Sequence, residues 1–321
     1  MAGNATLAIM IYQALTRMAM PPLSRLLTSL LLLTCMSSHA DDNTSPEITT
    51  IDIPGDVINE ASALTRSHRN PEMLWTLNDS GGDAAIHALS TTGELLGTVT
   101  LTGPGVINQD WEDMASFTRD QRHFLLIGDV GDNFAWRPNI TLYLIEEPAL
   151  TMPEEAAKVP VLHTFRVQLP NGPRDIEAIA VDPEENAAYL ISKRDNRPTL
   201  YRFSLAHADT ERVTELVASN LGEINIPRAD RNNHFVNWVT AMDFSESGRW
   251  AYVGTLSHGY RYLREPGESW QAALLKAPLG FRQPKLRQIE GGCFDVRDDQ
   301  QLFVISETLP AKMARIRWSS P

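Results

Sequence analysis

The segment Gln109–Asn133 reads QDWEDMASFTRDQRHFLLIGDVGDN and contains one complete structural unit. An acid, Glu112, begins a short apolar run, a polar turn follows at 118–122, and a second apolar run ends in the Gly/Asp-rich loop 128–133. This pattern predicts two antiparallel strands joined by a tight turn. Because a hairpin returns the chain to its starting end, we expect the acids before the first strand and after the second to lie together.

The same plan recurs in four other segments, which makes it a sequence repeat. These segments are 59–82, 175–194, 239–258 and 289–308. We align the first-strand positions as Glu60, Glu112, Glu177, Thr240 and Glu290. The residues after the second strands are then Asp79, Asp129, Lys193, Thr255 and Glu307, at offsets of 19, 17, 16, 15 and 17.

Further apolar segments follow each hairpin and predict third and fourth strands. The predicted third strands are 85–90, 140–145, 200–205, 273–277 and 313–318, and the fourth are 96–101, 161–169, 213–218 and 284–288. Four strands per unit without helical periodicity are typical of a β-propeller blade. The last unit lacks a fourth strand, so we expect residues 48–53 to supply it and close the ring. The fold class is therefore all-β, a propeller of five four-stranded blades, because no segment is left for a sixth.

The N-terminal residues 1–40 have the features of a cleaved secretory signal. Arg25 precedes the apolar run 26–34, and Ser38 and Ala40 are small residues at the positions that a signal peptidase reads. The apolar run is too short to span a membrane. We therefore expect a periplasmic or secreted protein whose residues 41–321 form a single domain, acting as a monomer.

The charge balance excludes some partners. With 28 basic and 40 acidic residues the chain has a net charge of −12, so it has no electrostatic reason to bind nucleic acid or an anionic membrane surface. Cys293 is the only cysteine outside the signal segment, so no internal disulfide is expected. We interpret Cys293 as a small buried apolar residue.

The innermost strand of each propeller blade lines a central channel, so Glu60, Glu112, Glu177 and Glu290 are expected to surround its mouth. Neighbouring carboxylates about 7 Å apart would repel each other by about 2 kcal/mol per pair. Either protons or a cation must relieve that repulsion. Calcium, which prefers six to eight oxygen ligands, is the expected ion. The alternative is that each Glu accepts backbone N–H bonds from the next blade and acts as a spacer.

Loops around the predicted mouth carry the other candidate residues. These are Asn78, Asp79, Asp129, Asp132, Asn133, Lys193, Arg194, His258 and Glu307. The loops 78–82 (NDSGG) and 128–133 (GDVGDN) can be tight turns or places where backbone approaches a ligand. Lys193 and Arg194 are either solvated, paired with Asp195, or directed inward, where they would suit a phosphate.

Several motifs together resemble a group of exported bacterial propellers that is loosely grouped with phytase-like esterase propellers. They are NDSGG, DWEDMA at 110–115, GDVGDN and DIEAIAVD at 175–182. More distantly, 177–178, 289–291 and 190–194 are similar to soluble calcium-activated nucleotidases, the apyrases. That resemblance implies five blades, calcium held by Glu60, Glu112, Glu177 and Glu290 with Ser62 as a helper, and hydrolysis of nucleoside di- and triphosphates.

Two functions follow as hypotheses. The first is a calcium-dependent hydrolase of phosphate esters or anhydrides, in which Asp79 or Asp129 positions water and the other loop residues bind the small phosphorylated substrate. The second is a non-catalytic propeller with a structural channel ion, which binds a protein or glycan in the cell envelope. No Gly-x-Ser-x-Gly elbow, HExxH helix or P-loop occurs in the sequence, so those three mechanisms have no local support.

Overall fold

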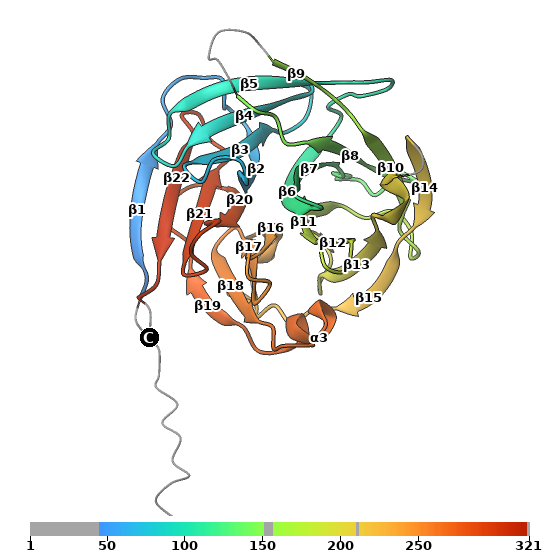
Figure 1. The fold of residues 1–321 in the computed structure, drawn as a ribbon. Coiled ribbons are helices and arrows are strands. Elements are labelled where there is room, and N and C mark those ends of the chain that lie inside the picture. The colour runs from blue at the N-terminus through green and yellow to red at the C-terminus, as the bar shows by residue number, and fades with distance from the viewer. Residues whose placement is uncertain (1–44, 151–156, 210–211, 320–321) are drawn as a thin grey trace, which may run out of the picture. The chain divides into compact units, whose positions relative to one another are not determined.

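The computed structural model describes residues 45–150, 157–209 and 212–319, which form five β-sheets arranged in a ring (Figure 1). The innermost strands of neighbouring sheets contact each other all the way round. This confirms the prediction of an all-β propeller with five blades. The signal segment predicted at 1–40 lies outside the described residues. Within the described part of the chain, no helix has the length and apolar character needed to cross a membrane.

The first four blades each run from an innermost strand outward. The first contains β2 (Ala61–Arg66), β3 (Met73–Asn78), β4 (Ala85–Ser90) and β5 (Leu95–Thr102). The second contains β6 (Trp111–Arg119), β7 (Arg122–Asp129), β8 (Ile140–Glu146) and β10 (His163–Gln168). The third contains β11 (Ile176–Asp182), β12 (Ala187–Ser192), β13 (Thr199–Ser204) and β15 (Ser219–Glu223). The fourth contains β16 (Val239–Phe244), β17 (Trp250–Thr255), β18 (His258–Leu263) and β19 (Leu279–Arg282).

The fifth blade is completed by a strand from the other end of the described chain. It contains β20 (Ile289–Phe294), β21 (Gln301–Ser306), β22 (Lys312–Arg317) and β1 (Glu47–Asp52). β1 pairs antiparallel with β22, with Ile48 opposite Ile316 and Ile51 opposite Met313. The predicted closure of the ring by residues 48–53 is therefore confirmed.

Two short strands at the rim link neighbouring blades. β9 (Ala157–Pro160) pairs in parallel with β5, and β14 (Val213–Val217) pairs in parallel with β10. The prediction of 213–218 as the fourth strand of its own blade is therefore wrong, because that place belongs to β15. From sequence, either β14 or β15 could be the outer strand of the third blade. β15 takes this place beside β13, because β14 pairs with β10 of the second blade.

The fourth blade also departs from the prediction. Residues 273–277 were expected to form a strand, but α3 (Trp270–Leu275) occupies most of that segment. Ser269 caps this helix by accepting from the backbone N–H of Ala272, and Trp270, Ala273 and Leu274 form its buried face. The third strand is β18, and the outer strand is β19 rather than 284–288. Two 3₁₀ turns, η1 (Ala206–Asp209) and η2 (Phe235–Asn237), complete the elements of the described residues.

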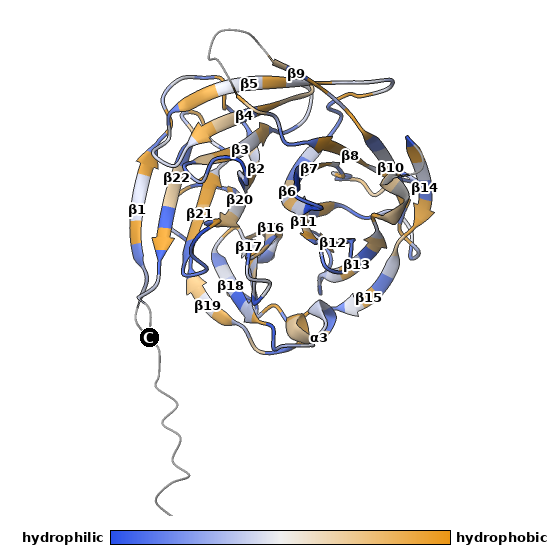
Figure 2. Cartoon of the chain, viewed as in Figure 1, coloured by the Kyte–Doolittle hydropathy of each residue, from blue (hydrophilic) through white to orange (hydrophobic). Residues whose placement is uncertain are grey.

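Apolar side chains fill the spaces between neighbouring sheets. Figure 2 shows that hydrophobic residues are concentrated in the strands. Trp75, Trp111 and Trp270 are among the largest fully buried side chains. Cys293 is free and buried, as predicted.

Each innermost strand has one edge without a partner strand. Side chains of the neighbouring blade accept hydrogen bonds from some of the backbone N–H groups on that edge. Asp113 Oδ2 accepts from the N–H of Ile179 at 2.6 Å, and Asp243 Oδ2 accepts from that of Phe294 at 2.8 Å. Asp113 and Asp243 thus perform the spacer role that was considered for the glutamates.

Candidate functional site at the channel mouth

A β-bulge near the start of every innermost strand defines a ring of equivalent positions. The register of each hairpin shifts across Ser62, Glu112, Glu177, Thr240 or Glu290. Bulges re-aim side chains, and four members of this ring line the cavity described below, namely Ser62, Glu112, Glu177 and Glu290. Two hydroxyl members bind the next blade: Ser62 Oγ donates to Trp111 O and Thr240 Oγ1 donates to Ile289 O, both at 2.8 Å.

The bulges correct the alignment of the five repeats at the first blade. Ser62, not Glu60, is equivalent to Glu112, and its offset to Asp79 is 17, as for Glu112 and Asp129. Glu60 lies two residues earlier, is exposed, and does not line the cavity described next. The outlying offset of 19 in the sequence alignment was the signal of this error.

A cavity of about 380 Å³ lies at this end of the ring, and most of the predicted site residues line it. The acids in its wall are Asp79, Glu112, Glu177, Glu290 and Glu307. Asn133, Lys193 and Arg194 also line it, together with Ser62 and the aromatic residues Phe235 and Trp238.

Besides Glu60, four predicted residues do not line this cavity. Asn78 holds a turn by accepting from Asn59 N–H and donating to Val57 O, and Asp132 accepts from the N–H groups of Trp136 and Arg137. Asp129 is buried and pairs with Arg137 at 2.8 Å. His258, half-buried at the start of β18, contacts Ser257 Oγ at 2.9 Å. In these positions Asn78, Asp129 and Asp132 support the loops around the mouth.

Lys193 is the cation among the channel carboxylates. Its Nζ lies 2.8 Å from Glu177 Oε2 and 3.7 Å from Glu290 Oε2, and the side chain is 10 % exposed. Burial alone would lower the pKa of Lys193, but the charges of Glu177, Glu290 and Glu112 raise it overall, so the ammonium group persists. Of the positions considered from sequence, Lys193 therefore takes the inward one and does not pair with Asp195.

Arg194 connects the loops around the cavity. Its Nε binds Asp175 Oδ2, its Nη2 binds Asn133 Oδ1, and its guanidinium lies 4.3 Å from the centre of the Trp238 ring. Asp175 Oδ1 also accepts from Asp132 N–H at 2.9 Å. This network fixes the loop after β7 against the end of β12.

Asp110 and Asp175 were missed by the sequence analysis, although a signal was present. Each stands two residues before a bulge glutamate, in DWE and DIE, and Glu60 holds the same place before Ser62. Trp238 and Gln288 hold it in the other two blades. The repeat therefore carries a second, outer ring of residues, to which Glu60 belongs.

The two rings bring carboxyl groups close together. One oxygen from each of Asp79, Asp110 and Glu112 lies within 4.8 Å of the others, and so does one from each of Glu112, Asp175 and Glu177. Gly131 makes part of this approach possible, because a Cβ at that position would lie 2.5 Å from Asp110 Oδ2 and 2.6 Å from Glu112 Oε1. Glu177 Oε1 and Glu290 Oε2 are buried and have no hydrogen-bond partner among the described residues.

Burial makes these carboxyl groups retain protons. It raises the pKa of Glu112, to which the charges of Glu177 and Asp79 add, and it raises the pKa of Glu177 to about 8 in spite of Lys193. Burial, with the charges of Glu290 and Asp79, raises the pKa of Glu307 to about 7. Burial, with Asp79 and Asp175, raises the pKa of Asp110 to about 6. The site can therefore hold or release protons near neutral pH.

Replacing Glu307 by Gln is expected to flatten the pH dependence of stability. The pKa of Glu307 is raised from 4.5 to about 7 in the folded protein. Its contribution to the free energy of unfolding is therefore fully present below pH 4.5 and is lost as the pH rises through about 7. For this half-buried group the loss is on the order of 1–2 kcal/mol after allowance for solvent screening. Urea unfolding at about pH 5 and about pH 8 measures it. Glu265→Gln, at an exposed position, is the control, and equal slopes for the two variants would contradict the assignment.

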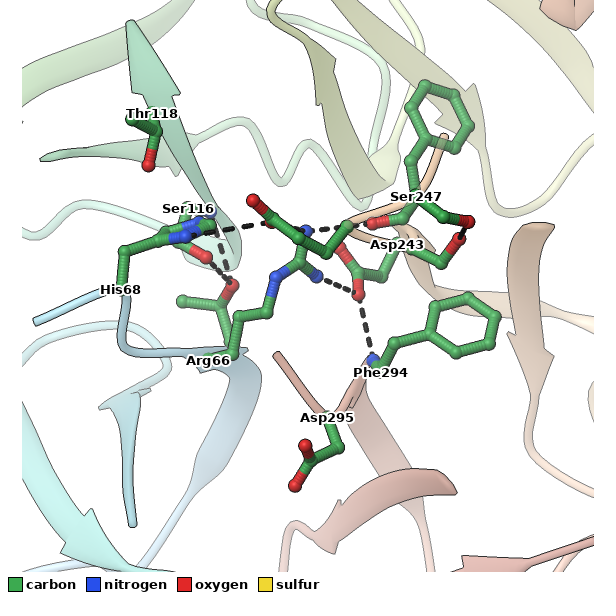
Figure 3. Close-up of polar contacts among 12 residues, drawn as sticks. Arg66, His68, Ser116, Thr118, Asp243, Ser247, Phe294 and Asp295 are labelled. Atoms are coloured by element: carbon green, nitrogen blue, oxygen red, sulfur yellow. Dashed lines mark hydrogen bonds and ion pairs between the residues drawn. The ribbon is translucent and has the colours of Figure 1, made fainter. Parts of the chain in front are cut away.

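The opposite end of the inner strands is closed by a buried ion pair (Figure 3). Arg66, at the end of β2, binds Asp243 Oδ2 at 2.6 Å and Phe244 O at 2.9 Å. The cavity beside Arg66 has a volume of only about 100 Å³, room for about three waters. The channel mouth is therefore the better candidate for a functional site.

Comparisons with known proteins do not identify a family. No protein-family model matches the chain, and no curated protein matches it. Among solved structures, the PQQ-bound aldose sugar dehydrogenase from Streptomyces coelicolor is similar, with 9% identity, 85% of this chain and 99% of that chain covered, and a TM-score of 0.45.

A luciferin-regenerating enzyme shows 10% identity over 85% of this chain and 95% of that chain, with a TM-score of 0.45. Hydrazine synthase of Kuenenia stuttgartiensis shows 11% identity over 80% of this chain and 71% of that chain, with a TM-score of 0.42. Similarity at this level concerns the fold alone. The protein is thus a five-bladed β-propeller with a carboxyl-rich cavity at one end of its channel.

Proposed function

We propose that this protein is an exported calcium-binding propeller that hydrolyses a phosphate ester or anhydride in the channel-mouth cavity. Two clusters of three carboxyl residues share Glu112 and lie beside Lys193 and Arg194. This arrangement is the observation that carries the proposal. The signal-like residues 1–40 and the sequence resemblance to exported phytase-like and apyrase propellers support the location and the reaction class.

The donor set fits a hard cation. Asp79, Asp110 and Glu112 supply only oxygen ligands, which calcium prefers, and Gly131 leaves the space that lets two of them approach each other. Glu177 Oε2 binds Lys193, and Asp175 is occupied by Arg194 and by Asp132 N–H. We therefore assign the ion to Asp79, Asp110 and Glu112. Glu60 is no longer proposed as a ligand, and Glu177 and Glu290 are instead the partners of Lys193.

The chain's own residues then divide the remaining work. A bound calcium ion would neutralise the carboxylates and polarise the phosphoryl oxygens. Lys193 and Arg194 can bind the negative charge of the phosphoryl group. Glu307, whose pKa is raised to about 7 by burial and by neighbouring acids, can give a proton to the leaving oxygen as the bond from phosphorus to that oxygen breaks. The attacking water forms the new bond to phosphorus, and its proton passes to a neighbouring carboxylate such as Asp79.

Calcium is expected to stabilise the wild-type protein and to have little effect on Asp110→Asn or Glu112→Gln. A ligand that binds only the folded state at a hundredfold excess over its Kd adds about 2.7 kcal/mol of stability. Thermal unfolding with calcium and with a chelator measures this. Glu60→Gln is the matched control, because it removes an exposed acid of the outer ring and should retain the full calcium response. A wild-type melting temperature that is indifferent to both additions would refute the site.

Hydrolysis is tested with a panel of phosphate monoesters, diesters and anhydrides, with and without calcium. We expect turnover only with the ion, and its loss in Glu112→Gln. Glu60→Gln should retain the wild-type rate. No turnover with any divalent metal would refute the catalytic part of the proposal, whatever the outcome of the calcium titration.

A second candidate function is binding of an envelope protein or glycan around a structural ion. Phe134 and Trp136 favour it, because they are 71% and 78% exposed and stack at 4.8 Å on the loop held by Asp132. Such aromatic surfaces suit sugar rings and protein partners. Calcium-dependent stability without turnover, together with glycan or protein binding that Trp136→Ala abolishes, would establish this function instead.

A further inference from the structure

A second cavity, of about 260 Å³, adjoins the channel mouth, and we call it the side cavity. Arg194 and Trp238 line both cavities, so they form the wall between them. The rest of the side cavity comes from the segment after β12 and from the 226–238 segment before β16. The two cavities are therefore direct neighbours, separated by these two side chains.

The lining of the side cavity has an apolar part and a cationic part. Trp238, Pro198, Ile226 and Pro227 supply flat or compact apolar surface, whereas Arg194 and Arg228 supply positive charge. Asp195 is the single acid in the lining, and it already accepts from Ser192 Oγ at 2.7 Å and lies 3.5 Å from Arg174. Arg194 is balanced by Asp175, whereas no acidic side chain among the described residues pairs with Arg228.

The walls are held in place before any ligand binds. Arg228 Nη2 donates to Asn196 O at 2.6 Å, and Tyr260 donates to Pro227 O at 2.7 Å. Asn237 accepts from Ala229 N–H and donates to Asp230 O, which closes the segment on itself. Arg194 over Trp238 fixes the shared wall. Such pre-organisation lowers the ordering cost of binding.

We propose that the side cavity binds the organic part of the ligand and selects a planar group that carries one carboxylate. The planar ring would lie against Trp238 and the prolines, and the carboxylate would face Arg228, whose single unbalanced charge matches one negative charge. This inference rests on the proposed function in one respect, namely that a phosphoryl group occupies the neighbouring channel mouth. The substrate class is then a phosphate ester of a hydroxylated aromatic acid.

Binding of 4-hydroxybenzoate, measured by calorimetry or ligand-observed NMR in the presence of a chelator, tests the side cavity without any turnover. We expect the wild type to bind 4-hydroxybenzoate about tenfold more tightly than phenol, which lacks the carboxylate. Arg228→Gln should remove that difference. Arg166→Gln, an exposed arginine on β10 in another blade, should retain it. Equal affinity of the wild type for the two probes, or an unchanged preference in Arg228→Gln, would overturn the proposal.

Hydrolysis of 4-carboxyphenyl phosphate separates this inference from the proposed function. Calcium-dependent cleavage with kcat/KM about tenfold above that of phenyl phosphate, reduced to parity in Arg228→Gln, would support both. Binding of 4-hydroxybenzoate through Arg228 without cleavage of either ester would refute the hydrolase and support the side cavity. Cleavage of both esters at equal rates would support the hydrolase and overturn the side cavity.

Discussion

Deletion of residues 47–53 is expected to open the ring and cost at least about 5 kcal/mol of stability, which lowers the melting temperature by about 10 °C or more. The deletion removes β1, the antiparallel partner of β22, and Ile53, which is buried in the core of this blade. It also removes the ion pair between Asp52 and Lys312, at 2.7 Å. β22 then becomes an exposed edge that can pair with other molecules, so aggregation is expected as well. Thermal unfolding and size-exclusion chromatography measure both effects.

A synthetic peptide separates strand pairing from other consequences of the deletion. The peptide EITTIDI, residues 47–53, should restore part of the melting temperature when added to the deletion variant. The same peptide with Thr50→Pro should not, because proline cannot continue the strand. A deletion variant that stays monomeric with the wild-type melting temperature would contradict closure by β1.

Replacing Lys193 by Met is expected to destabilise the protein by about 3–5 kcal/mol near pH 8, because Glu177 and Glu290 lose their counter-ion and must take up protons to stay buried. Methionine preserves the length of the side chain and removes the ammonium group that lies 2.8 Å from Glu177 Oε2. The loss should become smaller at lower pH, since the pKa of Glu177 is already raised to about 8 with Lys193 present, and proton uptake costs less free energy as the pH falls. Denaturant unfolding across this pH range measures the effect.

The control for this variant is Lys285→Met, which removes a lysine at an exposed position and should change stability by less than about 0.5 kcal/mol. Calcium should stabilise Lys193→Met more than the wild type, because the ion is then no longer repelled by the ammonium group of Lys193. An unchanged stability of Lys193→Met near pH 8 would show that Lys193 is not the counter-ion of the channel carboxylates.

The repeat predicted the candidate site in outline but misplaced some of its members. Glu112, Glu177 and Glu290 line the cavity as expected, since a residue at the start of an inner strand must lie near the channel. Glu60 does not, because the β-bulge, a feature of strand pairing, makes Ser62 the equivalent residue. Asp110 belongs to the candidate ion site because the fold brings it close to Asp79, which lies in another blade. The sequence pattern of one blade cannot show this contact.

The sequence alone determined the blade number, the hairpin of each blade and the closing strand, because alternating apolar runs and Gly/Asp turns are local signals that recur at regular spacing. Only the tertiary structure decided which charged side chains are buried. Lys193 looks like a surface lysine after a strand, yet the surrounding blades enclose it with Glu177 and Glu290. The helix α3 and the pairing of β14 with β10 also depend on neighbouring blades. The physical reason is the same in each case: burial and pairing partners come from residues far away in the chain, whereas propensity and turn chemistry act between neighbours.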